Sequence, residues 1–151
     1  MLRKTLSLSL IALILPACTI VQEIEPSKIQ SGNELCLIEN SKVRESFLIE
    51  FKQILDERNI QHRVVSETDI PRSCEWTATY TANWRWDLAL YLAYVEIKIF
   101  HLGNLDGKVT YDSTRGGGNM SKFIDAETKI RELVNELLQY KSALLFSRHF
   151  G

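Results

Sequence analysis

Two short stretches of the chain combine residue types that could do chemistry, and one of them is a glycine-rich loop. It contains Arg115, Gly116, Gly117 and Gly118. Ser121 follows as a predicted helix start, where free backbone N–H groups can bind an anion such as phosphate. The loop is not a P-loop, because that motif places a glycine directly before the lysine, and here Ser121 precedes Lys122. The alternative is that the glycines only form a tight bend between a strand and a helix.

The other stretch, residues 83–87, is the densest cluster of aromatic and charged side chains. In an extended strand, Trp84 and Trp86 would lie on one face, and Asn83, Arg85 and Asp87 on the other. Tryptophan and arginine are enriched at binding hot spots, so this stretch is a candidate recognition surface. The alternative is a buried aromatic pair beside a local ion pair of Arg85 and Asp87 that fixes a turn. Burial of both tryptophans would contradict the recognition surface.

The remaining polar residues provide no catalytic or metal-binding motif. The loose candidates are His62, Asp87, His101 and Asp112. None of them belongs to a nucleophile–base pair or a pair of carboxylates. The cysteines have no CxxC spacing, and the histidines are scattered without the spacing of metal ligands. We therefore expect no catalytic residue, no metal site and no cofactor.

The composition is typical of one globular domain. The chain has 151 residues, of which 45% are hydrophobic and 25% are charged. Only seven glycines and three prolines are present, which argues against a disordered or collagen-like chain. The formal net charge is -1, so the chain lacks the basic field that nucleic-acid binding requires, and we expect no nucleic-acid partner.

Residues 1–17 have the pattern of an export signal. Arg3 and Lys4 precede an apolar run over residues 6–15, which is typical of a secretory signal peptide. The run is about half the length of roughly 20 residues that a membrane-spanning helix needs. Export would place the rest of the chain outside the cytoplasm.

The signal ends in Leu15, Pro16, Ala17 and Cys18, which resemble the lipobox of bacterial lipoproteins. That resemblance implies cleavage before Cys18 and acylation of its thiol, so that lipid chains would attach the protein to a membrane. Because Thr19 and not an aspartate follows, the resemblance also implies the outer membrane, with the protein facing the periplasm. The alternative is an ordinary signal peptide that is cleaved without lipidation.

Two further cysteines, Cys36 and Cys74, would lie in a compartment where thiols oxidise. Their even number favours one disulfide, which would stabilise the domain by about 4 kcal/mol through loop closure. The alternative is two independent buried thiols.

The hydrophobic pattern predicts the elements of the N-terminal half. Residues 19–33 show no sustained period and are expected to be a tether between lipid and domain. A strand is expected over 34–38, and an amphipathic helix over about 41–58 with Asn40 or Ser41 as its N-cap. A second strand is expected over 61–66.

The C-terminal half begins with a stretch, residues 76–100, that is rich in residues favoured in strands. Apolar side chains occupy even positions up to Leu88 and odd positions from Val95, so a turn or bulge is expected between about Trp84 and Leu90. A turn over 101–107 and a strand around residues 109–112 follow. A second helix should begin at Ser121 and carry one apolar face made of Ile130, Leu133, Val134, Leu137 and Leu138. Residues 139–151 extend that helix or fray.

The expected order is β-α-β-β-β-α over residues 34–138, a single two-layer α+β domain. Two helices would cover one face of a mixed or antiparallel four-stranded sheet. The other face should be wetter, with threonines or aromatic side chains directed toward water or a partner.

Three parts of the sequence, read together, resemble the Sbal-type lipoproteins, a family of small Gram-negative lipoproteins without assigned activity. These parts are Cys18, the string over residues 79–91 and the string over residues 115–123. The resemblance extends over nearly the whole chain, including Cys36 and Cys74, although the tail beyond Gln139 is longer than the family pattern. It implies no catalytic residue. The order of elements is also similar to periplasmic lipoprotein domains that assist transport or assembly, an analogy of fold alone.

These patterns favour a non-enzymatic, outer-membrane-anchored lipoprotein that binds a protein or another envelope component. Trp84, Arg85 and Trp86 would form the contact. One alternative is a small envelope enzyme or anionic-ligand-binding protein that uses the glycine-rich loop and Arg115. Another is a purely structural lipoprotein.

Overall fold

The computed structural model describes residues 19–139 of the chain. The predicted signal peptide, Cys18 and the tail from residue 140 lie outside the described residues. The strands are β1 (Val21–Glu25), β2 (Glu34–Ile38), β3 (Gln61–Val65), β4 (Trp76–Asp87), β5 (Ala89–His101) and β6 (Asn104–Asp112). The helices are α1 (Glu45–Glu57) and α2 (Ala126–Leu137), with a short 3₁₀ helix, η1 (Met120–Phe123), before α2.

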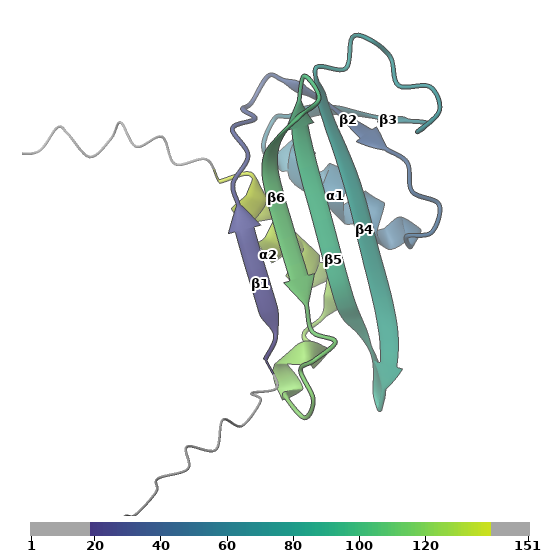
Figure 1. Ribbon diagram of the computed structural model, residues 1–151, viewed down its shortest axis with the longest axis vertical. Helices are drawn as coiled ribbons and strands as arrows, with labels where there is room; N and C mark the ends of the chain where they lie inside the picture. Colours follow the sequence, from purple (N-terminus) through teal and green to yellow (C-terminus); the bar gives the residue numbers. More distant parts are fainter. Residues whose placement is uncertain (1–18, 140–151) are drawn as a thin grey trace, which may run out of the picture.

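The strands form one mixed sheet in the order β1-β6-β5-β4-β2-β3 (Figure 1). Strand β2 runs parallel to β3 and to the first part of β4, while the pairs β4–β5, β5–β6 and β1–β6 are antiparallel. The parallel β2–β3 pair needs a crossover, and α1 provides it. Between β4 and β6 the chain is a meander of long hairpins, as the alternating pattern of residues 76–112 predicts.

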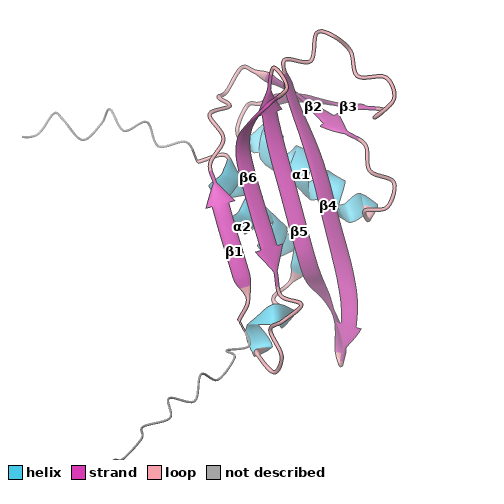
Figure 2. Cartoon of the chain, in the orientation of Figure 1, coloured by secondary structure: helices cyan, strands magenta, loops and turns pink. Residues whose placement is uncertain are grey.

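Both helices cover the same face of the sheet (Figure 2). Their apolar side chains pack on the core-facing positions of the strands, which include Leu37, Tyr80, Ile97 and Tyr111. The predicted face of α2 is confirmed, since all five of its residues are buried. The opposite face of the sheet is polar and carries partly exposed side chains such as Thr79, Glu96 and Lys98. The expected two-layer α+β arrangement with one wet sheet face is therefore found.

The number of strands is larger than expected. The β-α-β-β-β-α order gives four strands, whereas residues 34–112 contain five and residues 21–25, expected to be tether, form β1. Strand β1 pairs with β6 over its whole length. Ser27 and Ile29, also within the expected tether, are buried. The tether interpretation is thus wrong for these residues. The local pattern of residues 21–25 is weak, but they form a strand because β6, which is distant in the sequence, pairs with them.

Both predicted helix N-caps are also wrong. Arg44 precedes α1, and the side chain of Asn40 instead donates a hydrogen bond to the carbonyl of Tyr80 at 2.9 Å. Asp125 caps α2 by accepting from the N–H of Thr128 at 2.9 Å, while Ser121 lies inside η1. In each case the capping residue lies three to four positions later than predicted, and the helix is correspondingly shorter.

The predicted disulfide is confirmed. Cys36 of β2 and Cys74 of the segment before β4 are bonded, with their Cα atoms 5.9 Å apart. The bridge joins β2 to the segment that leads into β4, and the two cysteines are 38 residues apart in the sequence. Among the described residues, no helix is both long and apolar enough to cross a membrane.

Candidate functional site

The β4–β5 hairpin extends past the rest of the sheet (Figure 1). The predicted recognition residues, 83–87, are the last five residues of β4 and lie next to its turn. Asp112, the last residue of β6, pairs with Tyr94, so β5 continues toward the turn without β6 beside it. The register of β4 and β5 shifts at Asn83 and Trp84, and Leu88 forms the turn with φ +61°. The predicted turn or bulge between about Trp84 and Leu90 is confirmed as both.

The two tryptophans of the hairpin share a strand face but differ in burial. Trp84 pairs with Leu92 and is partly buried at the helix layer, where the guanidinium of Arg44 lies 4.9 Å from its ring centroid. It lines a groove of about 140 Å³ with residues of α1 and α2. Trp86 pairs with Leu90 and is 75% exposed. The interpretation as a buried aromatic pair is therefore wrong for Trp86.

The predicted ion pair between Arg85 and Asp87 is replaced by another. Asp87 contacts the ammonium group of Lys122, which also donates to the carbonyl of Gly117 at 2.6 Å. Lys122 is only 5% exposed, and its ammonium group lies 5.4 Å from the ring centroid of Tyr91. Because a buried lysine needs such partners, this contact fixes η1 and the glycine-rich loop to the hairpin.

The glycine-rich loop is a tight bend that packs on the N-terminal part of the described chain. A Cβ on Gly116 would lie 3.0 Å from the Ser113 carbonyl and 3.3 Å from the side chain of Ile20. Gly117 has φ +50° and directs its carbonyl to Lys122. These contacts give the anion-binding interpretation no support, because the nearby buried cation is already held by Asp87 and Gly117.

Arg85 and Arg115 are both exposed and lie close enough to Asp112 to act on its charge. Hydrogen bonds from Thr114 hold the pKa of Asp112 below its ordinary value, and the charges of Arg115 and Arg85 add to this effect. The folding of the hairpin thus brings together two of the predicted binding residues from distant parts of the chain. Their shared neighbour is a carboxylate.

The loose catalytic candidates are not brought into one site. His62 pairs with Asp56 at 3.0 Å, whereas the His101 ring stacks on Trp76 with their centroids 4.1 Å apart. His101 lies at the end of β5, opposite the turn at Leu88. Within residues 19–139, no group of three or more histidine, cysteine or acidic side chains could hold a metal ion.

Exposed apolar side chains gather at the end of the hairpin and in the neighbouring η1 segment. We call this set the hairpin-end patch: Trp86 (75% exposed), Leu88 (90%), Leu90 (48%), Met120 (74%) and Ile124 (36%). Helix η1 packs against β5 through Phe123 and Tyr91, whose ring centroids are 5.7 Å apart. The sequence prediction included Trp86 but missed the others. Leu88 could have indicated this patch from the sequence, because a leucine is unusual at a turn position that favours glycine or asparagine.

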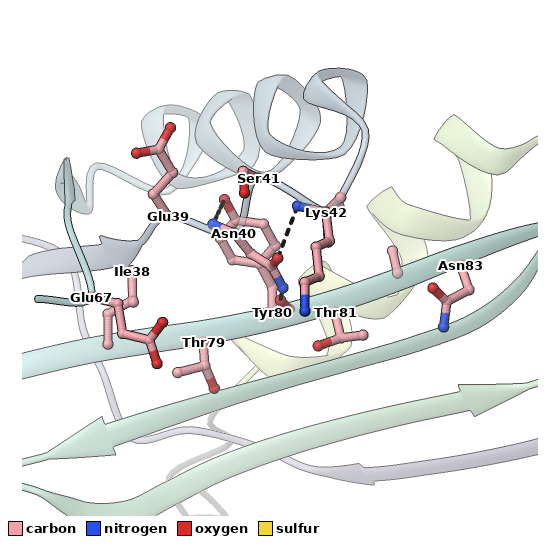
Figure 3. Close-up of a pocket in the computed structure, with 12 residues that line it drawn as sticks. Ile38, Glu39, Asn40, Ser41, Lys42, Glu67, Thr79, Tyr80, Thr81 and Asn83 are labelled. Carbon is pink, nitrogen blue, oxygen red and sulfur yellow. Dashed lines mark hydrogen bonds between the residues drawn. The ribbon is translucent and has the colours of Figure 1, made fainter.

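A second concave feature lies at the edge of β4, where the pairing with β2 ends at Ala78 (Figure 3). It is a groove of about 500 Å³ lined by Ile38, Glu39, Asn40, Ser41, Lys42, Val43, Glu67, Thr79, Tyr80, Thr81, Ala82 and Asn83. The backbone N–H of Asn40 donates to the Tyr80 hydroxyl at 3.3 Å, and burial raises the pKa of that hydroxyl. The groove follows from the divergence of two strands, which no local pattern in the sequence reveals.

The comparisons with known proteins identify a fold. No family model and no curated protein match the sequence. Two structures of a PelC dodecamer from Paraburkholderia phytofirmans are similar. A point variant in space group C2 has a TM-score of 0.56 and 12% identity, and the match covers 80% of this chain and 98% of that chain. The form in space group P6 has a TM-score of 0.50 and 12% identity, with 80% and 96% covered. At this identity the likeness establishes a shared fold alone.

Proposed function

We propose that this protein is a non-enzymatic lipoprotein of the outer membrane that faces the periplasm and binds another envelope component through its hairpin end. The observation that carries the proposal is the exposure of Trp86 beside Leu88 at the end of a paired β-hairpin. A large aromatic side chain that is three-quarters exposed to water contributes little hydrophobic stabilisation to the fold. The same side chain contributes favourable binding free energy when a partner covers it.

The anchor in this proposal is Cys18, at the end of the lipobox-like residues. Two observations support an exported chain: the apolar leader of the sequence and the bond between Cys36 and Cys74, since disulfides persist in oxidising compartments. The same two features are in keeping with membership of the Sbal-type lipoproteins. The absence of a supporting catalytic arrangement around His62, Asp87, His101 and Asp112 within residues 19–139 favours a binding role over an enzymatic one.

Photo-crosslinking in cells tests the contact. A photoreactive residue replaces Trp86 in the full-length protein, and the matched control replaces Gln53, an exposed residue of α1. We expect a discrete adduct at position 86 and none at position 53. A folded, membrane-associated protein that gives neither a protein adduct nor a lipid adduct at position 86 would contradict the contact surface.

Fatty-acid labelling tests the anchor separately. The wild-type protein should incorporate a labelled fatty acid, and Cys18→Ser should not. Equal labelling of both proteins would refute the anchor at Cys18.

The likeness to the PelC dodecamer favours a second candidate function, assembly of several copies into one complex. The two edges of the sheet and the open edge of β4 offer backbone groups for pairing between copies. Native mass spectrometry of the detergent-solubilised full-length protein should then detect one defined oligomer. A monomer at every concentration would exclude this candidate.

A further inference from the structure

We infer that the envelope component bound by the hairpin-end patch is the lipid bilayer in which the protein is anchored. This inference rests on the proposed function and names the partner of its contact surface. It requires that the anchor and the patch lie at the same end of the molecule, that the patch is suited to a membrane surface, and that the fold alone does not explain it.

The described chain begins at the hairpin end. Val21, the first residue of β1, pairs with Asp112, and Ile20 packs on Gly116 in the glycine-rich loop. Strand β1 therefore enters the sheet from the same end as the β4–β5 turn and η1 (Figure 1). Thr19 is bonded directly to Cys18, so a lipid on Cys18 would be attached at this end.

The hairpin has the length to reach a membrane surface beside such an anchor. Tyr94 is level with Asp112, and the six residues from Tyr94 to Leu88 extend about 20 Å beyond that level at about 3.3 Å per residue. The three residues from Val21 back to Cys18 can span at most about 10 Å. Because the segment between Cys18 and β1 is shorter than the protruding part of the hairpin, lipidation of Cys18 would bring the turn at Leu88 to the bilayer.

The side chains at this end suit the interface between lipid and water. Among the described large apolar residues, the three most exposed are Leu88, Trp86 and Met120, and all belong to the hairpin-end patch. Tryptophan is enriched where headgroups meet acyl chains, and burial of leucine in the acyl region adds affinity. Arg85 and Arg115 are exposed nearby, where a guanidinium group can bind a lipid phosphate. Of the two acidic residues named at this end, Asp87 pairs with Lys122, and Asp112 lies near both arginines and bonds to Thr114.

The fold does not account for a leucine at the turn. Leu88 has φ +61°, a left-handed backbone conformation that residues other than glycine and asparagine rarely adopt. It is 90% exposed and so contributes almost no buried area. At the opposite end of β5, Leu102 has φ +50° and is 65% exposed. Leu102 thus provides a matched control with the same residue type and backbone conformation, far from the chain start.

The test uses the full-length lipidated protein reconstituted in vesicles of phosphatidylethanolamine and phosphatidylglycerol, with or without brominated acyl chains. Bromine quenches tryptophan fluorescence at short range. We expect quenching in the wild type, loss of that quenching in Trp86→Phe, and its retention in Trp76→Phe, because Trp76 is buried at the other end of β4. Absence of quenching, or equal quenching in Trp86→Phe, would overturn the inference.

The two turn leucines sharpen the test. Leu88→Asn should reduce the quenching of Trp86 severalfold, because it removes apolar area from the inserted end, and Leu102→Asn should not. Asparagine tolerates the left-handed conformation, so both variants should fold. Equal quenching in the two variants would count against insertion of the turn.

The outcomes separate this inference from the proposed function. A protein adduct at position 86 together with absent quenching would overturn the bilayer as partner and leave the contact surface standing. A second copy of this chain in that adduct would identify the patch as an interface between copies. Failure of Cys18 to incorporate fatty acid would instead overturn the anchor on which both rest.

Discussion

Trp76 and Trp86 lie on the same strand and the same face of the sheet, yet their environments are opposite. Trp76 is 9% exposed, stacks on His101 and belongs to the core. Trp86 is 75% exposed at the other end of β4. Residue type and strand alternation are identical for the two, so neither determines burial here.

The length of the covering layer explains the difference. Strand β4 has 12 residues and extends about 40 Å, whereas the 13 residues of α1 extend only about 20 Å. One face of a long strand therefore cannot be covered by a helix of similar residue count. The core occupies the part of the strand under the helices, and the part beyond them remains available for a partner.

The largest expected effect contrasts the two tryptophans directly. Trp76→Ala should lower the free energy of unfolding by about 3 to 5 kcal/mol, because it leaves a cavity in the core. Trp86→Ala should change it by less than about 0.5 kcal/mol. Denaturant unfolding followed by circular dichroism measures both. Similar losses in the two variants would mean that the hairpin end is part of the cooperative core.

The second prediction concerns the lysine that fixes the hairpin end. Lys122→Met should cost about 1 to 3 kcal/mol, since it removes the bonds to Asp87 and Gly117 while keeping most of the apolar stem. Hydrogen exchange should become faster in η1 and in the loop around Gly117. The amides of β4 near Trp76 should keep their protection.

Lys129→Met is the control for this prediction. The Lys129 ammonium group bonds Glu132 at 2.7 Å and lies 5.2 Å from the Tyr111 ring, so this lysine is also packed on an aromatic side chain. It lies on α2, and its loss should leave exchange at η1 unchanged. Faster exchange at η1 in both variants would indicate a general loss of stability and not release of the hairpin end.

Local patterns are sufficient for elements whose partners lie close in the sequence. The strand at 34–38 and the apolar face of α2 are predictable because short apolar runs and helical spacing are properties of a few consecutive residues. The turn near Leu88 follows from a change of parity along one stretch. The disulfide follows from the even number of cysteines that remain when Cys18 is set aside as the predicted lipid anchor.

Contacts between distant residues are beyond such patterns. Strand β1 depends on β6, and the Gln22 side chain adds hydrogen bonds to Glu132 and Glu136 of α2. The alternative interpretation of residues 83–87 pairs Asp87 with its near neighbour Arg85, but in the folded chain Asp87 contacts Lys122 from a later segment. The candidate site is only partly predictable for the same reason: Trp86 stands out by type, whereas Met120 and Ile124 join it only through the packing of η1 on β5.

The smallest expected effect is a difference in acid sensitivity between the loop after β6, near the hairpin, and the surroundings of Trp76 at the start of β4. The pKa of Asp112 is lowered in the folded protein, chiefly by hydrogen bonds from Thr114, including one from its N–H at 2.8 Å. A lowered pKa means that this stabilisation is fully present above the ordinary pKa of an aspartate and is lost as the pH falls through the folded value. Below about pH 4, the loop after β6 should therefore exchange hydrogen faster, while the surroundings of Trp76 stay protected.

Asp112→Asn isolates this contribution, because it keeps an acceptor oxygen for Thr114 but no longer titrates. The variant should lose stability at neutral pH by about 1 kcal/mol or less and should lack the additional opening of the loop below about pH 4. Glu23→Gln, which changes an exposed carboxylate of β1, is the control and should retain that opening. If Asp112→Asn still opens in acid as the wild type does, Asp112 is not the responsible group. If that opening is absent in Asp112→Asn, Asp112 is the carboxylate through which the loop after β6 responds to acid.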